Sequence, residues 1–471
     1  MVIRTRDRNL AFLVAICFFM ENLDATIVTT AAPRLGQALH VPSESVSLLV
    51  SAYLVTFAMG IPIGGWLVTR FGERRVFVIA IVIFTGASLL CALSGSFSEL
   101  VVARTLQGVG AALMVPVGRL VVLANAAKTD IMRLIAFIVW PGLLAPVLAP
   151  FVGGVIVTFA SWPWLFLLNV PIGVGALLAA LRMMPRQPSF STTRSSLDVN
   201  GMSLVCLALG GLVYSAFVAS QTKSSWILIS LFTACSLTVL VLAVFHLLQT
   251  RNPFVDLRVL TVRSLRESLF GISLFIMTVG AVPMLLPLLF QNRFGWSPIK
   301  SGSLVLFVFV GNMGAKPATT SLLNRYGHRR VLIYSTSGVA LTMLLFSQID
   351  ASTSLAVIAL LAVLNGIFRS VGYSAYMTLG FADVSEDRMS AANVLSATVQ
   401  QVFAGFAIAA SVVALRLGLL AHHWASSTSQ GAFSFEFAFI LLAIVGAMAT
   451  VEAFLMHPNT GEALRKSTRR I

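Results

Sequence analysis

The few charged residues of this chain divide it into long apolar stretches, and this pattern constrains the fold more than any other feature. Between Leu134 and Leu181 there is no Asp, Glu, Lys or Arg. Of the 471 residues, 58% are hydrophobic and only 10% are charged, against about a quarter charged in a soluble domain. A soluble chain cannot bury so much apolar surface. The sequence therefore predicts an all-α integral membrane protein and excludes soluble enzymes, nucleic-acid-binding proteins and secreted modules.

A membrane-spanning helix needs about twenty mostly apolar residues, and the sequence divides into fourteen such segments. The predicted spans are 10–32, 46–69, 76–95, 100–122, 134–159, 163–181, 200–220, 225–249, 268–291, 301–322, 331–348, 353–380, 389–415 and 432–456. The fifth and sixth spans are separated at Ser161-Trp162-Pro163, because Trp and Pro suit a tight turn at the membrane surface.

The positive charges predict the orientation. With this segmentation, twenty-three Lys and Arg residues fall on the side that holds both termini, and five fall on the other side. Because Lys and Arg are enriched in cytoplasmic loops, both termini are predicted to be cytoplasmic. The net charge of +15 follows from the same excess and needs no nucleic-acid partner.

No motif for catalysis or for a cofactor is present. The sequence contains no GxxxxGK[ST], HExxH or GxSxG pattern. The four cysteines lie inside apolar runs, so we expect buried thiols, no metal site and no cofactor. We therefore expect no enzymatic activity.

An internal repeat predicts the architecture. Residues 70–76 read Arg-Phe-Gly-Glu-Arg-Arg-Val, and residues 325–331 read Arg-Tyr-Gly-His-Arg-Arg-Val. The copies are eight spans apart, an even number, which predicts parallel halves with a substrate site between them. The predicted organisation is a six-helix half at 1–195, a two-helix insertion at 196–262 and a second six-helix half at 263–471.

Four stretches resemble motifs of the major facilitator superfamily, in its fourteen-helix drug/proton antiporter branch. They are Leu23 to Val28 with Ala32-Pro33 in the first span, Gly65 to Arg75 after the second, Arg104 to Gly110 in the fourth, and Pro146 with Pro150 to Gly154 in the fifth. The chain departs from the family pattern where Thr69 replaces the usual loop aspartate and Ala149 replaces a glycine.

This resemblance implies proton-coupled efflux of drugs and other lipophilic compounds, by alternating access, in a bacterial-type inner membrane. The implied partners are a small-molecule substrate, protons and membrane lipids, with no nucleic acid, and the family precedent is a monomer. It also implies a gating set comprising Gly65, Arg70, Gly72, Arg74, Arg75, Gly327, Arg329, Arg330, Pro146, Pro150, Gly153 and Gly154. The arginines of the two loops are expected to bind helix C-terminal carbonyls, acids or lipid phosphates, and to latch the outward-facing state of the transporter.

Ionisable side chains inside spans are functional candidates, because each costs roughly 3 kcal/mol to insert. Counted at 1.5 Å per residue, Asp24 and Arg104 reach nearly the same depth, so we expect them to pair. A movement that changes their separation would change proton affinity, and with Glu21, one turn away, they form the predicted proton-coupling group. The alternatives are a fixed salt bridge for the pair and a polar residue without a role for Glu21.

Lys316 and Arg369 are cations inside the second half, where spans nine to thirteen contain no acid. They favour an anionic or zwitterionic substrate, and the alternative is that they reach the cytoplasm or helix-end carbonyls. The predicted substrate cavity comprises Lys316, Arg369, Gln107, Tyr53, Asn393 and Gln400. The sequence thus leaves drug efflux as one functional hypothesis and export of an anionic metabolite (a tricarboxylate, siderophore or metal chelate) as a second. A non-transporting membrane sensor is a third.

Overall fold

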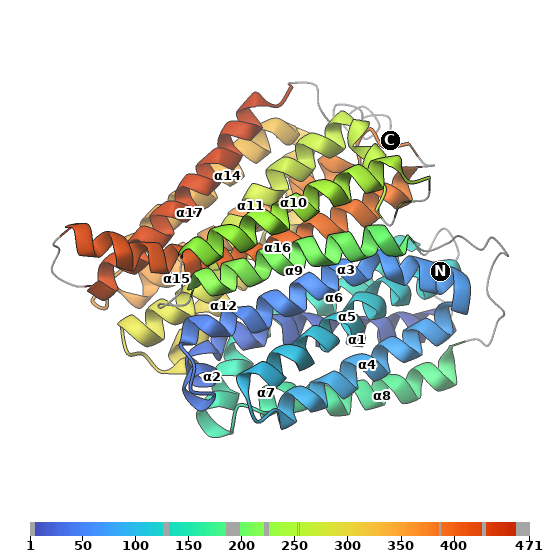
Figure 1. Cartoon of the computed structure of the whole chain (residues 1–471), viewed down its shortest axis with the longest axis horizontal. Coiled ribbons are helices and arrows are strands. Elements are labelled where there is room, and N and C mark those ends of the chain that lie inside the picture. Colours follow the sequence, from blue (N-terminus) through green and yellow to red (C-terminus); the bar gives the residue numbers. More distant parts are fainter. Residues whose placement is uncertain are drawn as a thin grey trace. The chain divides into compact units, whose positions relative to one another are not determined.

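The computed structural model describes residues 5–125, 131–184, 198–220, 226–251, 253, 255–385, 388–425 and 430–457. Within these ranges the regular elements are all helices (Figure 1). Long helices follow directly from the sequence, because a chain surrounded by lipid must satisfy its backbone hydrogen bonds internally. The described part of the chain is therefore built of helices joined by short connections, as the sequence predicts.

The helices up to Met183 are α1 (Thr5–Thr30), α2 (Ala32–Ala38), α3 (Ser47–Phe71), α4 (Glu73–Leu93), α5 (Phe97–Asn125), α6 (Ile131–Phe159), α7 (Trp164–Leu167) and α8 (Asn169–Met183). The segment predicted to be an insertion contains α9 (Val199–Ser220) and α10 (Trp226–Gln249). The remaining helices are α11 (Arg263–Leu288), α12 (Pro298–Gly314), α13 (Lys316–Tyr326), α14 (His328–Ser347), α15 (Leu355–Gly380), α16 (Met389–Ala425) and α17 (Gln430–Leu455).

Each of the fourteen predicted segments coincides with one helix or with two consecutive helices. Ten segments of the described chain are long and apolar enough to cross a membrane, and shorter apolar stretches lie at Ser47–Phe57 in α3, Leu148–Phe159 in α6 and Val199–Leu212 in α9. The predicted break between the fifth and sixth spans is confirmed, since α6 ends at Phe159 and α7 begins at Trp164. The protein is thus a multi-pass membrane protein, and the count of fourteen crossings stays a prediction.

The chain forms two compact units, residues 1–213 with 235–254 and residues 214–234 with 255–471. In the first unit α1 packs against α6, α5 and α8, while α4 packs against α5 and α8, and α3 packs against α5. In the second unit α11 packs against α16, α15 and α17, while α14 packs against α15 and α17, and α12 packs against α15. The same set of neighbours recurs helix for helix, which is what a duplicated half predicts.

The repeated loop has the same backbone in both copies. Gly72 has φ +84° and Gly327 has φ +78°, a region that L side chains rarely adopt. In both copies the glycine N–H donates to the carbonyl four residues earlier, of Val68 or Leu323, at 2.9 Å. The glycine lets one long helix end and the next begin without a connecting loop.

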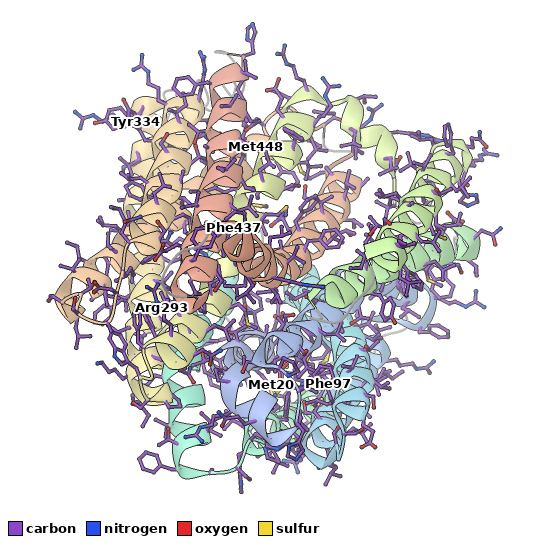
Figure 2. The ribbon with its side chains drawn as sticks, turned by 60° about the vertical axis from the view of Figure 1, so that its left-hand side comes forward. Met20, Phe97, Arg293, Tyr334, Phe437 and Met448 are labelled. Carbon is purple, nitrogen blue, oxygen red and sulfur yellow. The ribbon has the colours of Figure 1, made fainter. Side chains whose placement is uncertain are left out.

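Many large apolar side chains lie on the outside of the helices. Tyr334, which projects from α14 in Figure 2, is 69% exposed, whereas Met20 of α1 is fully buried. An apolar exterior suits a lipid environment. The expectation of four buried cysteines is confirmed for Cys17 and Cys91 and wrong for the other two, because Cys206 is half-buried on α9 and Cys235 is exposed on α10.

Candidate functional site

The carboxylate of Asp24 is fully buried among side chains of the first unit and accepts three hydrogen bonds. The Arg104 guanidinium donates through Nη1 to Oδ2 at 2.5 Å. The Gln107 and Asn169 amides donate to Oδ1 at 3.0 and 2.7 Å. The predicted pairing of Asp24 with Arg104 is confirmed, and it joins α1 to α5 and α8.

Arg104 is held by several groups besides the carboxylate. Its Nη1 also donates to Gln107 Oε1 at 2.8 Å, and its Nε donates to the carbonyl of Leu49 on α3 at 3.3 Å. The Tyr53 ring lies 4.3 Å from the guanidinium carbon, a cation–π distance. Arg104 Nη2 has no hydrogen-bond partner among the described residues. One guanidinium nitrogen is therefore left with its hydrogen-bonding capacity unused.

The network continues to α4 through Gln107. Its Nε2 donates to Ser88 Oγ at 2.8 Å, and Cys91 Sγ lies 3.6 Å from its Oε1. Gln107 and Tyr53, predicted to line a substrate cavity, are both fully buried and lie beside the ion pair. The Tyr53 hydroxyl has no partner among the described residues.

Asn169 and Ser88 are parts of this network that sequence reasoning missed. Asn169 could have been found, because it is the only amide side chain in the uncharged run from Leu134 to Leu181. An isolated amide in such a run needs a polar partner inside the protein. Ser88 carries no comparable signal, because serines are frequent in the spans and bond readily to their own helix.

Glu21 lies one turn from Asp24 on α1 and is 5% exposed. Its Oε2 accepts a hydrogen bond from the neighbouring Asn22 amide at 3.0 Å. Two acids thus lie within one turn of α1, and of the two, Asp24 holds the ion pair with Arg104.

Helix α6 approaches α1 closely near this pair. A Cβ added at Gly153 would lie 3.0 Å from Ile27 Cγ1 and 3.2 Å from the Ile27 carbonyl oxygen. Pro150 and Gly154 are buried on the same helix. Gly65 and Pro146 lie within α3 and α6, and their surroundings fall outside what the structure describes.

The two basic loops make equivalent contacts in their own units. Arg74 Nη2 donates to the carbonyl of Leu181, near the end of α8, at 2.7 Å, and Arg329 Nη2 donates to the carbonyl of Phe454, near the end of α17, at 2.6 Å. Both arginines thus bind free carbonyls at a helix C-terminus, one of the three expected partner types. Arg70 lies over Trp66, and Arg75 and Arg330 are exposed.

Replacing Arg74 or Arg329 by Ala is expected to lower the free energy of unfolding by about 1 kcal/mol, because each change removes one hydrogen bond and one charge at a helix end. If the loops also act as a latch, transport should fall as well. Thermal unfolding of the purified protein and uptake into vesicles would be measured together. The exposed neighbour Arg75→Ala is the matched control for stability, and an equal loss of stability in Arg74→Ala and Arg75→Ala would contradict the account.

A second polar cluster lies in the second unit, around Tyr373 of α15. Lys316 Nζ donates to Ser374 Oγ at 3.0 Å and lies 6.0 Å from the Tyr373 ring. The Tyr373 hydroxyl donates to Gln400 Oε1 on α16 at 2.5 Å. Three predicted cavity residues from different helices, Lys316, Arg369 and Gln400, are thus gathered near one tyrosine, whereas Asn393 is exposed on α16.

Arg369 has few partners. Its guanidinium lies 5.5 Å from the Phe309 ring, and its buried Nη1 has no hydrogen-bond partner among the described residues. Neither Lys316 nor Arg369 forms an ion pair with any described residue. Two cations inside an apolar half therefore lack a counter-charge in this part of the chain.

Comparison with known proteins identifies the family. The sequence profile of the Major Facilitator Superfamily matches residues 14–409 and, in a second alignment, residues 268–470. The chain belongs to this superfamily. A protein of Salmonella dublin named "Putative multidrug resistance protein MdtD" is 33% identical over 95% of this chain and 94% of its own length. Its namesake in Escherichia coli O157:H7 is 33% identical over 90% of each chain.

Solved structures support the same fold. A D-xylose–proton symporter superposes with a TM-score of 0.68 at 16% identity, covering 96% of this chain and 98% of its own. A peptide transporter of the POT family superposes with a TM-score of 0.67 at 13% identity, covering 94% and 97%. At these identities the likeness is one of fold. Together with the family assignment, this likeness of fold indicates that the protein is a transporter of small substrates and not an enzyme.

Proposed function

We propose that this superfamily member is a proton-coupled efflux transporter for drugs and other lipophilic compounds, working by alternating access in the inner membrane with both termini cytoplasmic. The observation that carries the proposal is the buried Asp24–Arg104 pair, which together with the Asn169 amide joins three helices of one unit. The name of the MdtD relatives supports the substrate class.

The pair is suited to link proton binding to movement. Protonation of Asp24 would remove the charge that attracts Arg104, which keeps its own charge in proteins. Arg104 would then be a buried cation without a counter-ion, an arrangement that costs several kcal/mol. The helices would have to move until Arg104 finds water or another acceptor.

Burial supports alternating access. Asp24 and Arg104 are both 0% exposed, so the Asp24 carboxylate cannot take up a proton from bulk water in this conformation. A second conformation has to open the site, and a ligand that favours that conformation would be coupled to the proton. A proton moving through 100 mV supplies about 2.3 kcal/mol, or roughly fiftyfold in substrate concentration.

The test is proton flux in proteoliposomes with an acidic interior. Addition of a lipophilic cation such as tetraphenylphosphonium should release protons from vesicles that contain the protein, and none from empty vesicles. Protein that folds, as judged by a cooperative thermal transition, but gives no release with any lipophilic cation tested would contradict drug/proton antiport.

A second candidate function is export of an anionic metabolite, such as a tricarboxylate, a siderophore or a metal chelate. Lys316 and Arg369, which form no ion pair with any described residue, favour it, because a carboxylate could bond to Arg369 Nη1.

Under this alternative, Arg369→Gln should weaken transport of citrate, with or without iron, by tenfold or more, since a charged hydrogen bond contributes about 1.5–3 kcal/mol. Flux of the lipophilic cation should be nearly unchanged. Parallel assays with both probes would be run on the wild type, on Arg369→Gln and on the exposed control Arg251→Gln. Wild-type protein that moves the cation and not citrate would remove this alternative.

A further inference from the structure

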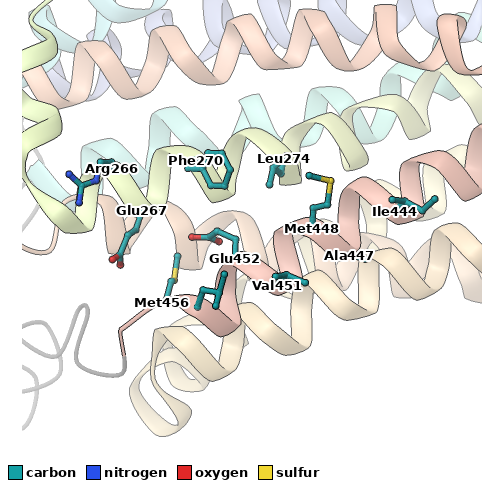
Figure 3. Close-up of a pocket in the computed structure, with 11 residues that line it drawn as sticks. Arg266, Glu267, Phe270, Leu274, Ile444, Ala447, Met448, Val451, Glu452 and Met456 are labelled. Carbon is teal, nitrogen blue, oxygen red and sulfur yellow. The ribbon is translucent and has the colours of Figure 1, made fainter.

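A groove of about 740 Å³ runs along the second unit between α11 and α17 and has no role in the proposed transport cycle (Figure 3). This volume lies within the range of small-molecule sites. Charged side chains line one end of it, and most of the remaining lining is apolar, including Phe270, Leu274, Ile444 and Met448. Several of the apolar ones are largely exposed, such as Phe270 at 60% and Met448 at 52%, so the groove opens on the outside of the two helices.

The groove contains a carboxylate with unused capacity. The Tyr376 hydroxyl donates to Glu452 Oε2 at 2.9 Å, and this is the only hydrogen bond to that carboxylate from the described residues. A Cβ added at Gly271 would lie 2.4 Å from Glu452 Oε2. The glycine therefore leaves the space that the carboxylate occupies. An ionised carboxylate can accept about four hydrogen bonds, so Glu452 is left short of donors.

A positive charge lies at the same end of the groove. Arg266 is exposed and forms no ion pair with any described residue. The neighbouring Glu267 accepts from Arg263 at 2.6 Å and is therefore already paired. One acid and one guanidinium, both without an ionic partner in the described chain, thus lie at one end of an apolar groove.

The helix ends place these charges at the edge of the membrane. Arg266 is three residues from the start of α11, and Glu452 is three residues from the end of α17, so each lies about 5 Å from its helix end. Leu274 and Ile444 lie eight residues further along their helices, about 12 Å deeper. The polar end is thus at headgroup level, and the apolar length extends toward the hydrocarbon.

We propose that this groove binds a phospholipid with a primary-ammonium headgroup, such as phosphatidylethanolamine. The ammonium donates to Glu452, the phosphate binds Arg266, and one acyl chain lies against Phe270, Leu274, Met448 and Ile444. A primary ammonium supplies the N–H donors that Glu452 lacks, whereas a choline headgroup has none. A purely cationic amphiphile would leave Arg266 unmatched, and an anionic lipid would leave Glu452 unmatched.

The test is native mass spectrometry of the purified full-length protein with phosphatidylethanolamine, phosphatidylcholine and phosphatidylglycerol of identical chains. Wild type should bind phosphatidylethanolamine about tenfold more tightly than the other two, as one charge-assisted hydrogen bond predicts. Glu452→Gln should remove this preference, and Arg266→Gln should weaken binding of all three lipids. Glu436→Gln is the matched control, because Glu436 is on the same helix but pairs with Arg293 near the other end.

Equal affinity of the wild type for the three headgroups would overturn the proposal, and so would a preference that survives in Glu452→Gln. Should Glu452→Gln fail to fold, phosphatidylethanolamine with a photoreactive acyl chain provides a second measurement on wild type. Crosslinks in 270–274 and 444–448 are expected, and crosslinks confined to other helices would refute the site. Displacement of the lipid by tetraphenylphosphonium without any headgroup preference would instead identify a cation site.

Discussion

Asp24→Asn should abolish substrate-driven proton release while leaving a protein that still inserts into the membrane. The substitution keeps the shape of the side chain and removes the carboxylate that pairs with Arg104. Asn169 and Gln107, which donate to Asp24 at 2.7 and 3.0 Å, can still bond to the new amide oxygen. These two hydrogen bonds can survive the substitution, whereas the bond from Arg104 to Oδ2 cannot, so the loss of release should reflect the missing charge.

The measurement is the proteoliposome assay with an acidic interior, with proton release expected to fall at least a hundredfold, to the level of empty vesicles. The control is Asp383→Asn, the same chemical change at an exposed residue between α15 and α16. Wild-type release from Asp24→Asn, in a preparation where Asp383→Asn is also active, would show that another group carries the proton. Glu21 would be the next candidate.

Substitutions of Asp24 and of Arg104 should lower the free energy of unfolding by different amounts. Asp24→Asn leaves Arg104 buried and charged with no counter-ion, because a guanidinium does not lose its proton in proteins. The free energy of unfolding should fall by about 3–5 kcal/mol. Arg104→Gln should cost less, because Asp24 can neutralise itself by taking up a proton. The double variant Asp24→Asn/Arg104→Gln, which has no buried charge here, should recover most of the loss of Asp24→Asn.

Unfolding can be followed with a maleimide dye, since Cys17 and Cys91 are buried and become reactive only when the helices separate. Cys206 is half-buried and Cys235 is exposed, so both would be replaced by Ser in every variant. The expected order of melting temperature is wild type, then the double variant and Arg104→Gln, then Asp24→Asn. Proton release should be lost in all three variants. A double variant less stable than Asp24→Asn would contradict a buried ion pair as the source of the loss.

Helix positions and the central ion pair could be predicted because both depend on regular geometry. Spans follow from the length of apolar runs, and the meeting of Asp24 with Arg104 follows from counting residues along two helices at 1.5 Å each. The repeated loop likewise predicted equivalent structures in the two units, which the matching φ values of Gly72 and Gly327 confirm.

The side-chain partners could not be predicted, because they depend on which helices pack together and at which rotation. Tyr53 is predicted as a polar residue of the substrate cavity, and the structure places its ring on the Arg104 guanidinium. The sequence likewise does not indicate that the Glu452 carboxylate bonds to Tyr376 beside an open groove. In both cases the neighbouring helix decides the role, and the sequence does not state which helix that is.

The most direct test of the central claim is proton release on substrate binding by purified protein in weakly buffered detergent solution. If Asp24 gives up its proton when substrate binds, tetraphenylphosphonium should release about one proton per molecule bound. Asp24→Asn should release none, even at concentrations that saturate binding, and Asp383→Asn should match the wild type. Release from Asp24→Asn equal to that of the wild type would contradict the account.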